Sequence, residues 1–162
     1  MASKPKRVPR SKPAATVMQG DRRKAYRPIS TEERRAALEA GLGAYARGEF
    51  FEAHELLEPA WMGASDPAER ALYQGIIKVA AGYVHAVRGN PSGVTKNLQG
   101  ARNLLAESLV GDPTVAQGHG VDLVRLLDAI DARLAAVPNA AAGLGAGMGP
   151  LIDLLPRAPK IR

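Results

Sequence analysis

The sequence predicts an all-α fold, a compact bundle of about five helices with disordered basic ends. Apolar residues recur at spacings of three and four along most of the chain, which is the period of one face of a helix. Three of the expected helices begin at a residue that commonly caps helices, at Ser30, Asp66 and Asn90. No segment shows the sustained alternation of apolar and polar residues that is typical of a strand.

The composition limits the kinds of site that the chain can build. It has 162 residues, 46% of them hydrophobic, which is enough for one compact domain with additional tails. It contains no cysteine, and this excludes disulfides, thiolate zinc sites and cysteine nucleophiles. Its three histidines also exclude a metal site built from many imidazoles.

Charge divides the chain into three parts. Residues 1–28 carry nine lysines and arginines against one acid, whereas residues 29–155 carry ten basic and fifteen acidic side chains. We therefore expect a disordered basic arm over residues 1–28 and a helical bundle domain over residues 29–138. Residues 139–162 are expected to form an Ala/Gly-rich linker and a basic C-terminal tail.

The basic arm suggests weak electrostatic contact with nucleic acid. Its single aromatic residue, Tyr26, gives little support for base stacking. No apolar run is long enough for a secretory signal or a membrane span, so we expect a cytoplasmic protein with no membrane partner.

Local signals place the first two helices. Ser30 and Glu33 form a capping box at the start of the first helix, and Gly48 follows its end. The second helix is expected over about residues 50–61. Pro59 removes a backbone donor late in that helix and predicts a kink or termination there.

The third and fourth helices begin with an N-cap followed by proline. The third runs from Asp66-Pro67 to about Arg88, and its apolar residues cover most of its circumference, which predicts a central position in the bundle. The fourth begins at Asn90-Pro91.

Beyond the fourth helix, we expect a loop at residues 112–120 and a fifth helix over about residues 121–137. The apolar face of that helix is expected to hold Val124, Leu127, Ile130 and Leu134. Further on, a short apolar patch is a candidate to dock on the bundle; its residues are Leu151, Ile152, Leu154 and Leu155.

The second helix carries the most informative candidate residues. At 3.6 residues per turn, His54 falls on the apolar face that also holds Leu57 and Trp61. A histidine on such a face requires a polar partner, and Glu58, one turn further on, is the nearest candidate. Glu55 is expected to point away from this face.

The third helix offers a matching polar stripe that contains Gln74 and His85. Two adjacent helices that both carry polar side chains predict a polar pocket between them. We expect this pocket to hold His54, Glu58, Gln74 and His85, with Trp61 in its wall or in the core.

These residues carry a resemblance to a known family. The string His54-x-x-x-Glu58-x-x-Trp61, followed by Gln74-Gly75-Ile76-Ile77 and His85-x-x-Arg88-Gly89-Asn90, resembles domain-of-unknown-function family 309. The match covers roughly residues 42–106. The resemblance implies a small all-helical prokaryotic domain with no assigned activity.

Three interpretations of the pocket stay open. The polar residues form a structural network or bind a small ligand; or His54, Glu58 and His85 hold a divalent metal ion; or the same three residues serve an acid–base or metal-assisted enzyme, for example a hydrolase. His119, between two glycines, is expected to be a loop residue rather than a ligand. The sequence leaves the ligand and the oligomeric state open.

Overall fold

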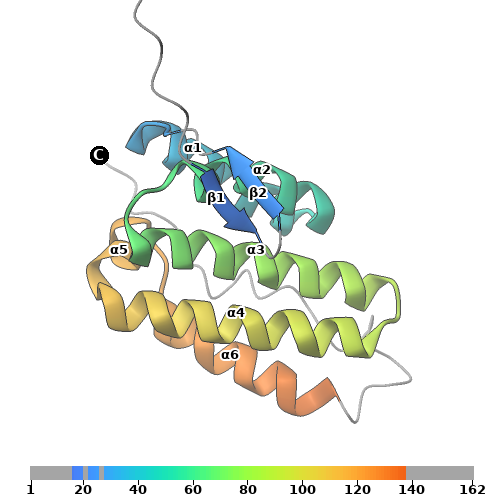
Figure 1. Ribbon diagram of the computed structural model, residues 1–162. Coiled ribbons are helices and arrows are strands. Elements are labelled where there is room, and N and C mark those ends of the chain that lie inside the picture. Colours follow the sequence, from blue (N-terminus) through green and yellow to red (C-terminus); the bar gives the residue numbers. More distant parts are fainter. Residues whose placement is uncertain (1–15, 20–21, 26–27, 138–162) are drawn as a thin grey trace, which may run out of the picture.

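The computed structural model describes residues 16–19, 22–25 and 28–137. It confirms the all-α bundle and contains six helices within these residues (Figure 1). The helices are α1 (Thr31–Ala46), α2 (Phe50–Gly63), α3 (Pro67–Val87), α4 (Pro91–Gly111), α5 (Pro113–Gly118) and α6 (Leu123–Ala136).

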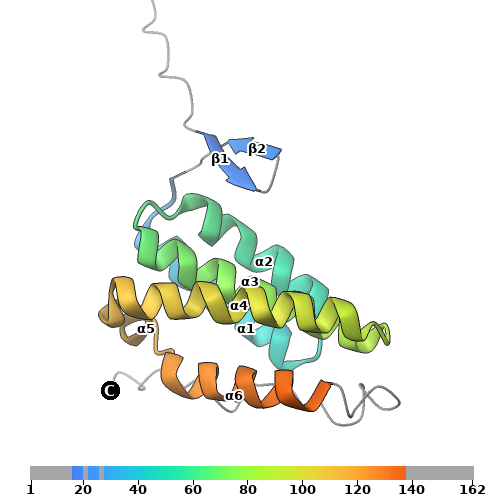
Figure 2. The ribbon, with the colours of Figure 1, turned by 60° about the horizontal axis from the view of Figure 1, so that its bottom comes forward.

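A short β-hairpin precedes the bundle, in the arm for which we predict disorder. Strands β1 (Thr16–Gln19) and β2 (Arg22–Ala25) pair antiparallel, with Gln19 opposite Arg22. The intervening sequence, Gly20-Asp21, is a pair of residues typical of hairpin loops. Figure 2 shows the hairpin outside the helical bundle. Contact of the arm with nucleic acid stays a prediction.

The predicted helix ends are largely confirmed because they depend on local chemistry. The hydroxyl of Ser30 accepts a hydrogen bond from the backbone N–H of Glu33, whose carboxylate accepts from the N–H of Ser30. Gly48 and Gly89 follow α1 and α3 with positive φ angles, of 79° and 66°. Asp66 caps α3 through the N–H of Glu69.

Pro59 does not end α2, which continues to Gly63. Pro59 and Glu55, whose carbonyl loses its helical donor, are both on the exposed side of the helix, where water can replace that donor. Ala60 and Trp61 are buried on the opposite side and hold the last turn against the core.

Two predictions about the C-terminal half of the bundle are wrong. The segment expected to be a loop contains α5, which begins at Pro113 and is capped by Asp112 through the N–H of Thr114. This is the same Asp-Pro signal that marks α3. Val124 is 57% exposed rather than part of the apolar face of α6, whose buried residues are Leu123, Leu126 and Ile130.

Helix α3 lies at the centre of the bundle, as its apolar circumference predicts. Figure 1 shows α1 and α2 on one side of α3, and α4 and α6 on the other. Close packing of α3 on α4 leaves no room for a side chain at Gly75 and little room at Gly82. A Cβ at Gly75 would lie 2.6 Å from Cγ of Leu105, and one at Gly82 would lie 3.1 Å from Cδ2 of Leu98. The backbones therefore approach more closely than larger residues would allow.

None of the helices within the described residues is long and apolar enough to cross a membrane. The predicted linker and tail, residues 139–162, lie outside the described residues.

Trp61 is only 3% exposed, so its replacement tests the packing of α2 on the core. We expect Trp61→Ala to lower the free energy of unfolding by about 3–5 kcal/mol, measured by urea denaturation, because it removes a large buried side chain. Phe51→Ala on the same helix is the control, since Phe51 is 62% exposed. A loss below about 1 kcal/mol for Trp61→Ala would contradict the assigned orientation of α2.

Candidate functional site

The structure brings His54 and Glu58 together on α2, and Glu55 joins them. One possible ligand atom from each of these three side chains lies within 4.8 Å of the other two. His54 Nδ1 is 3.2 Å from Oε1 of Glu55. Glu55, which the helical projection places away from His54, reaches it because both side chains lie toward solvent.

His54 is not buried in the apolar face of α2. Its side chain is 29% exposed, and its ring stacks on that of Phe51 with centroids 6.4 Å apart. The buried face is centred on Ala53 and Leu57, so His54 lies at its flank. The ring reaches water and has Glu55 within 3.2 Å, so His54 is not the histidine within an apolar face that the sequence predicts.

His85 lies outside this group and faces a different helix. Its Nδ1 is 3.2 Å from Nδ2 of Asn90, and a Cβ at Gly93 would collide with the His85 ring, so the ring packs on the start of α4. Gln74 is half-buried on α3. Trp61 is buried and belongs to the core.

Of the residues predicted to share a pocket between the second and third helices, the structure groups His54 and Glu58 with Glu55 on α2, whereas His85 packs on α4. A cavity of about 380 Å³ lies elsewhere, where α4, α5 and the start of α6 meet.

A buried polar network that the sequence did not reveal joins α1, α3 and the residue after α5. Arg34 donates to both carboxylate oxygens of Glu69, at 2.8 and 3.3 Å. The Tyr73 hydroxyl donates to Glu69 Oε1 at 2.9 Å, and its oxygen lies 3.1 Å from Nε2 of His119. The side chains of Glu69 and His119 are 11% and 7% exposed. His119, in the turn that follows α5, is thus a buried member of a network.

Charges and burial set the ionisation of the network. Burial alone would raise the pKa of Glu69, but the hydrogen bonds from Arg34 and Tyr73 outweigh it and hold that pKa below its ordinary value. Burial and the hydrogen bond to Glu69 raise the pKa of Tyr73, which keeps the phenol protonated. Glu69 is therefore a carboxylate, and Tyr73 is a donor to it.

The donor roles fix the tautomer of His119. Because the Tyr73 proton points to Glu69, Nε2 of His119 donates to the Tyr73 oxygen. Nδ1 of His119 is buried without a hydrogen-bond partner among the described residues. A second proton would have to sit on Nδ1 with no acceptor. Burial accordingly lowers the pKa of His119, although Glu69 opposes this shift.

One sequence signal for this network was available. Glu69 and Tyr73 share a helix face with Ile76, and a carboxylate on such a face requires a partner. The partners themselves, Arg34 and His119, are distant in sequence from α3, so local patterns do not identify them.

The family comparison covers the centre of the bundle. The family model described as Domain of unknown function (DUF309) matches residues 38–97, from α1 into α4. The matched segment includes the α2 group, Glu69 and Tyr73, whereas Arg34 and His119 lie outside it. No curated protein and no solved structure matches the chain.

Glu69 provides a test of the buried network. We expect Glu69→Leu to lower the free energy of unfolding by about 3–5 kcal/mol, because it leaves the Arg34 charge without its partner. The double variant Arg34→Met/Glu69→Leu removes both charges and should recover part of this loss. Urea denaturation measures both. If the losses of stability in the two single variants add up in the double variant, Arg34 and Glu69 are not a coupled pair. The control is Arg102→Met, which breaks the exposed Arg102–Asp131 pair and should cost little stability.

The buried neutral His119 predicts a pH dependence of stability. Its pKa is lowered in the folded state, so the unfolded chain takes up this proton first as the pH falls. The contribution is fully present above about pH 6.5, the ordinary histidine value, and is lost below it with a slope of at most about 1.4 kcal/mol per pH unit.

Urea denaturation at pH 7.5 and 5.5 measures this effect. His119→Gln retains a donor toward Tyr73 but does not titrate, so its stability should fall less over this interval than that of the natural chain. Equal losses in the two proteins would exclude His119 as the titrating group.

Proposed function

We propose that the domain binds a divalent metal ion on α2. The family model that matches residues 38–97 is described only as a domain of unknown function, so this proposal rests on the chain's own side chains. The ligands are His54, Glu55 and Glu58. The proximity of the three possible ligand atoms, all within 4.8 Å of one another, is the observation that carries this proposal.

The chemistry of the donors supports binding of a first-row metal ion. One imidazole and two carboxylates are ligands for zinc and manganese, with bonds of about 2.0–2.2 Å for zinc. Ligand atoms around such an ion lie about 3–3.5 Å apart, and His54 and Glu55 are already 3.2 Å apart. Glu55 is 54% exposed, so its carboxylate can change rotamer without disturbing the core.

The Phe51 ring supports the same site by stacking on His54 and restricting the imidazole orientation. Three protein ligands leave further coordination positions for water or for a small anionic ligand. A small ligand could therefore bind at this site by coordinating the metal ion. His85 is left out of the ligand set because it contacts Asn90 at the α3–α4 connection.

The structural role considered for the pocket residues is better assigned to the buried network. The network of Arg34, Glu69, Tyr73 and His119 is buried and holds separate segments together, which is the role considered for the His54 group. An acid–base enzyme without metal would use His54 with Glu55 or Glu58. In such an enzyme His54 would act without a bound metal ion, which distinguishes it from the proposed metal site.

Calorimetric titration of the metal-free chain with Zn²⁺ or Mn²⁺ alone tests the proposal. We expect saturable binding of one ion, and a loss of affinity of more than about tenfold, or about 1.4 kcal/mol, in His54→Ala and in Glu58→Gln. His85→Ala is the matched control and should bind as the natural chain does. No binding, or equal losses in His54→Ala and His85→Ala, would contradict the site.

A further inference from the structure

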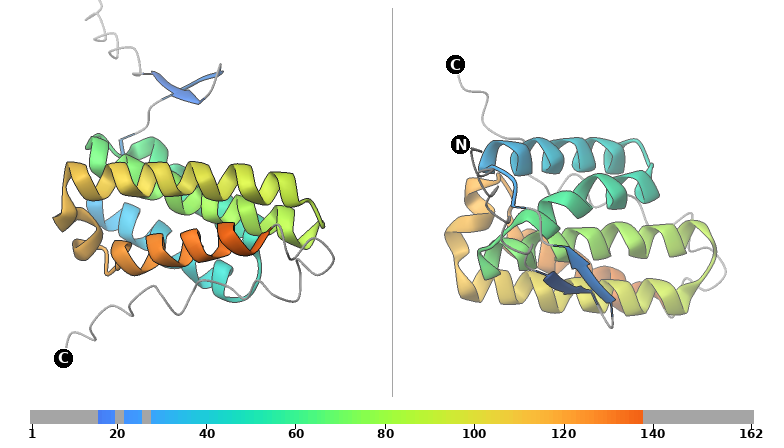
Figure 3. Two further views of the ribbon diagram at one scale, coloured as in Figure 1. Left: turned by 90° about the horizontal axis from the view of Figure 1, so that it is seen from below. Right: turned by 45° about the horizontal axis from the view of Figure 1, so that its top comes forward.

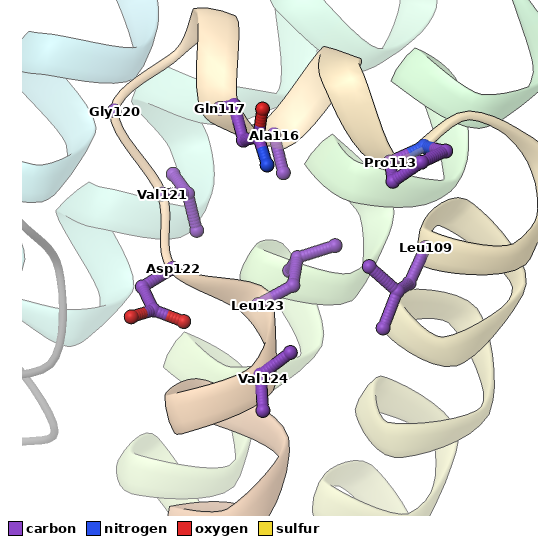
Figure 4. A pocket seen from close by; sticks show the side chains of 9 residues that line it. All are labelled: Leu109, Pro113, Ala116, Gln117, Gly120, Val121, Asp122, Leu123 and Val124. Atoms are coloured by element: carbon purple, nitrogen blue, oxygen red, sulfur yellow. The ribbon is translucent and has the colours of Figure 1, made fainter.

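The cavity at the junction of α4, α5 and α6 is open to solvent, and its lining is mostly apolar, with Gln117 and Asp122 as the polar side chains. Figure 4 shows Leu109, Pro113, Val121, Leu123 and Val124 around it. Val121 and Leu123 are nearly buried, whereas Val124 is 57% exposed at its edge. We call this feature the α6 groove.

We propose that residues 151–155 of the same chain occupy the α6 groove. This segment, Leu-Ile-Asp-Leu-Leu, is an apolar cluster in the sequence beyond α6. At helical spacing its four aliphatic residues fall on one side and Asp153 on the opposite side. An aliphatic surface of this kind complements a groove lined by leucine, valine and proline.

The length of the intervening chain matches the distance that it has to cover. Helix α6 runs back along α4 and is joined to it by the ion pair between Arg102 and Asp131, and its C-terminal end lies toward the α3–α4 turn (Figure 3). The 14 residues of α6 span about 21 Å at 1.5 Å per residue, and the groove lies at the start of that helix.

The connection from α6 to the apolar segment is residues 138–150, and it is rich in glycine and alanine. A Gly-rich chain of that length has a root-mean-square end-to-end distance of about 20 Å. Effective concentration is greatest when the average length of a linker equals the span between the two sites. The linker therefore has a suitable length for the apolar segment to reach the groove.

Charge supports the same placement. Asp122 lines the groove, and residues 29–137 carry 14 acidic and ten basic side chains. The apolar segment is followed by Arg157, Lys160 and Arg162. A basic end next to an acidic domain favours docking of the chain end on its own bundle.

The absence of natural cysteine permits a direct cross-linking test on the full chain. The variant Val124→Cys/Leu154→Cys places one thiol at the groove edge and one in the segment. We expect mild oxidation to form an intramolecular disulfide at least about tenfold faster than in the control Val87→Cys/Leu154→Cys. Val87 is 72% exposed and ends α3, at the end of the bundle where α6 also ends.

Two further measurements decide what occupies the groove. Leu151→Asp in the Val124→Cys/Leu154→Cys background should remove the rate advantage, since it places a charge in the apolar contact. Equal cross-linking rates for the Val124 and Val87 pairs would overturn the proposal. Disulfide-linked dimers that disappear on dilution would also overturn it, because the occupant would then be a second copy of the chain.

Discussion

The carboxylate of Glu69 accepts hydrogen bonds from α1 and α3 at once, and the rest of the bundle depends on this arrangement. Arg34 approaches it from α1, and Tyr73 approaches it from the next turn of α3. His119 follows α5 and closes the network through Tyr73. A buried carboxylate is costly unless it is fully paired, so these segments can pack together only in the positions that satisfy it.

This constraint also orients α2, which carries the proposed metal site. The N-terminal end of α3 is fixed to α1 by Glu69. Helix α2 packs against both helices, with Leu57 and Trp61 buried in the core. With these residues facing the core, His54 and Glu58 are turned to the flank of the helix, where the imidazole remains accessible. The buried polar residues therefore maintain the fold, whereas the side chains of His54 and Glu55 on α2 reach solvent.

Sequence reasoning predicted those features that depend on neighbouring residues. The cap at Ser30, the Asp66-Pro67 start and the positive φ at Gly48 are each determined within one turn of the chain. It was less accurate for helix faces. The sequence pattern predicts a buried face for Val124 and His54, and both lie at its edge. Successive residues of a helix point about 100° apart, so a small error in the centre of the buried face moves a side chain to its edge.

The contacts that define the buried network cannot be predicted from local sequence patterns. Arg34 and Glu69 are separated by 35 positions, and Tyr73 and His119 by 46, and no local period links them. The sequence also predicts one contact that the structure does not contain, the shared site of His54 and His85. Both histidines lie in the matched DUF309 segment, but His85 faces α4, so a shared motif did not imply a shared site.

The chain has only three histidines, so one nuclear magnetic resonance experiment can test this division of roles. A two-dimensional ¹H–¹⁵N spectrum of the imidazole rings, recorded with and without Zn²⁺, reports on His54, His85 and His119 separately. The account predicts that Zn²⁺ shifts the ring nitrogens of His54 alone, while His119 remains the neutral Nε2–H tautomer. A shift at His119, or an unchanged His54 ring at saturating Zn²⁺, would contradict it.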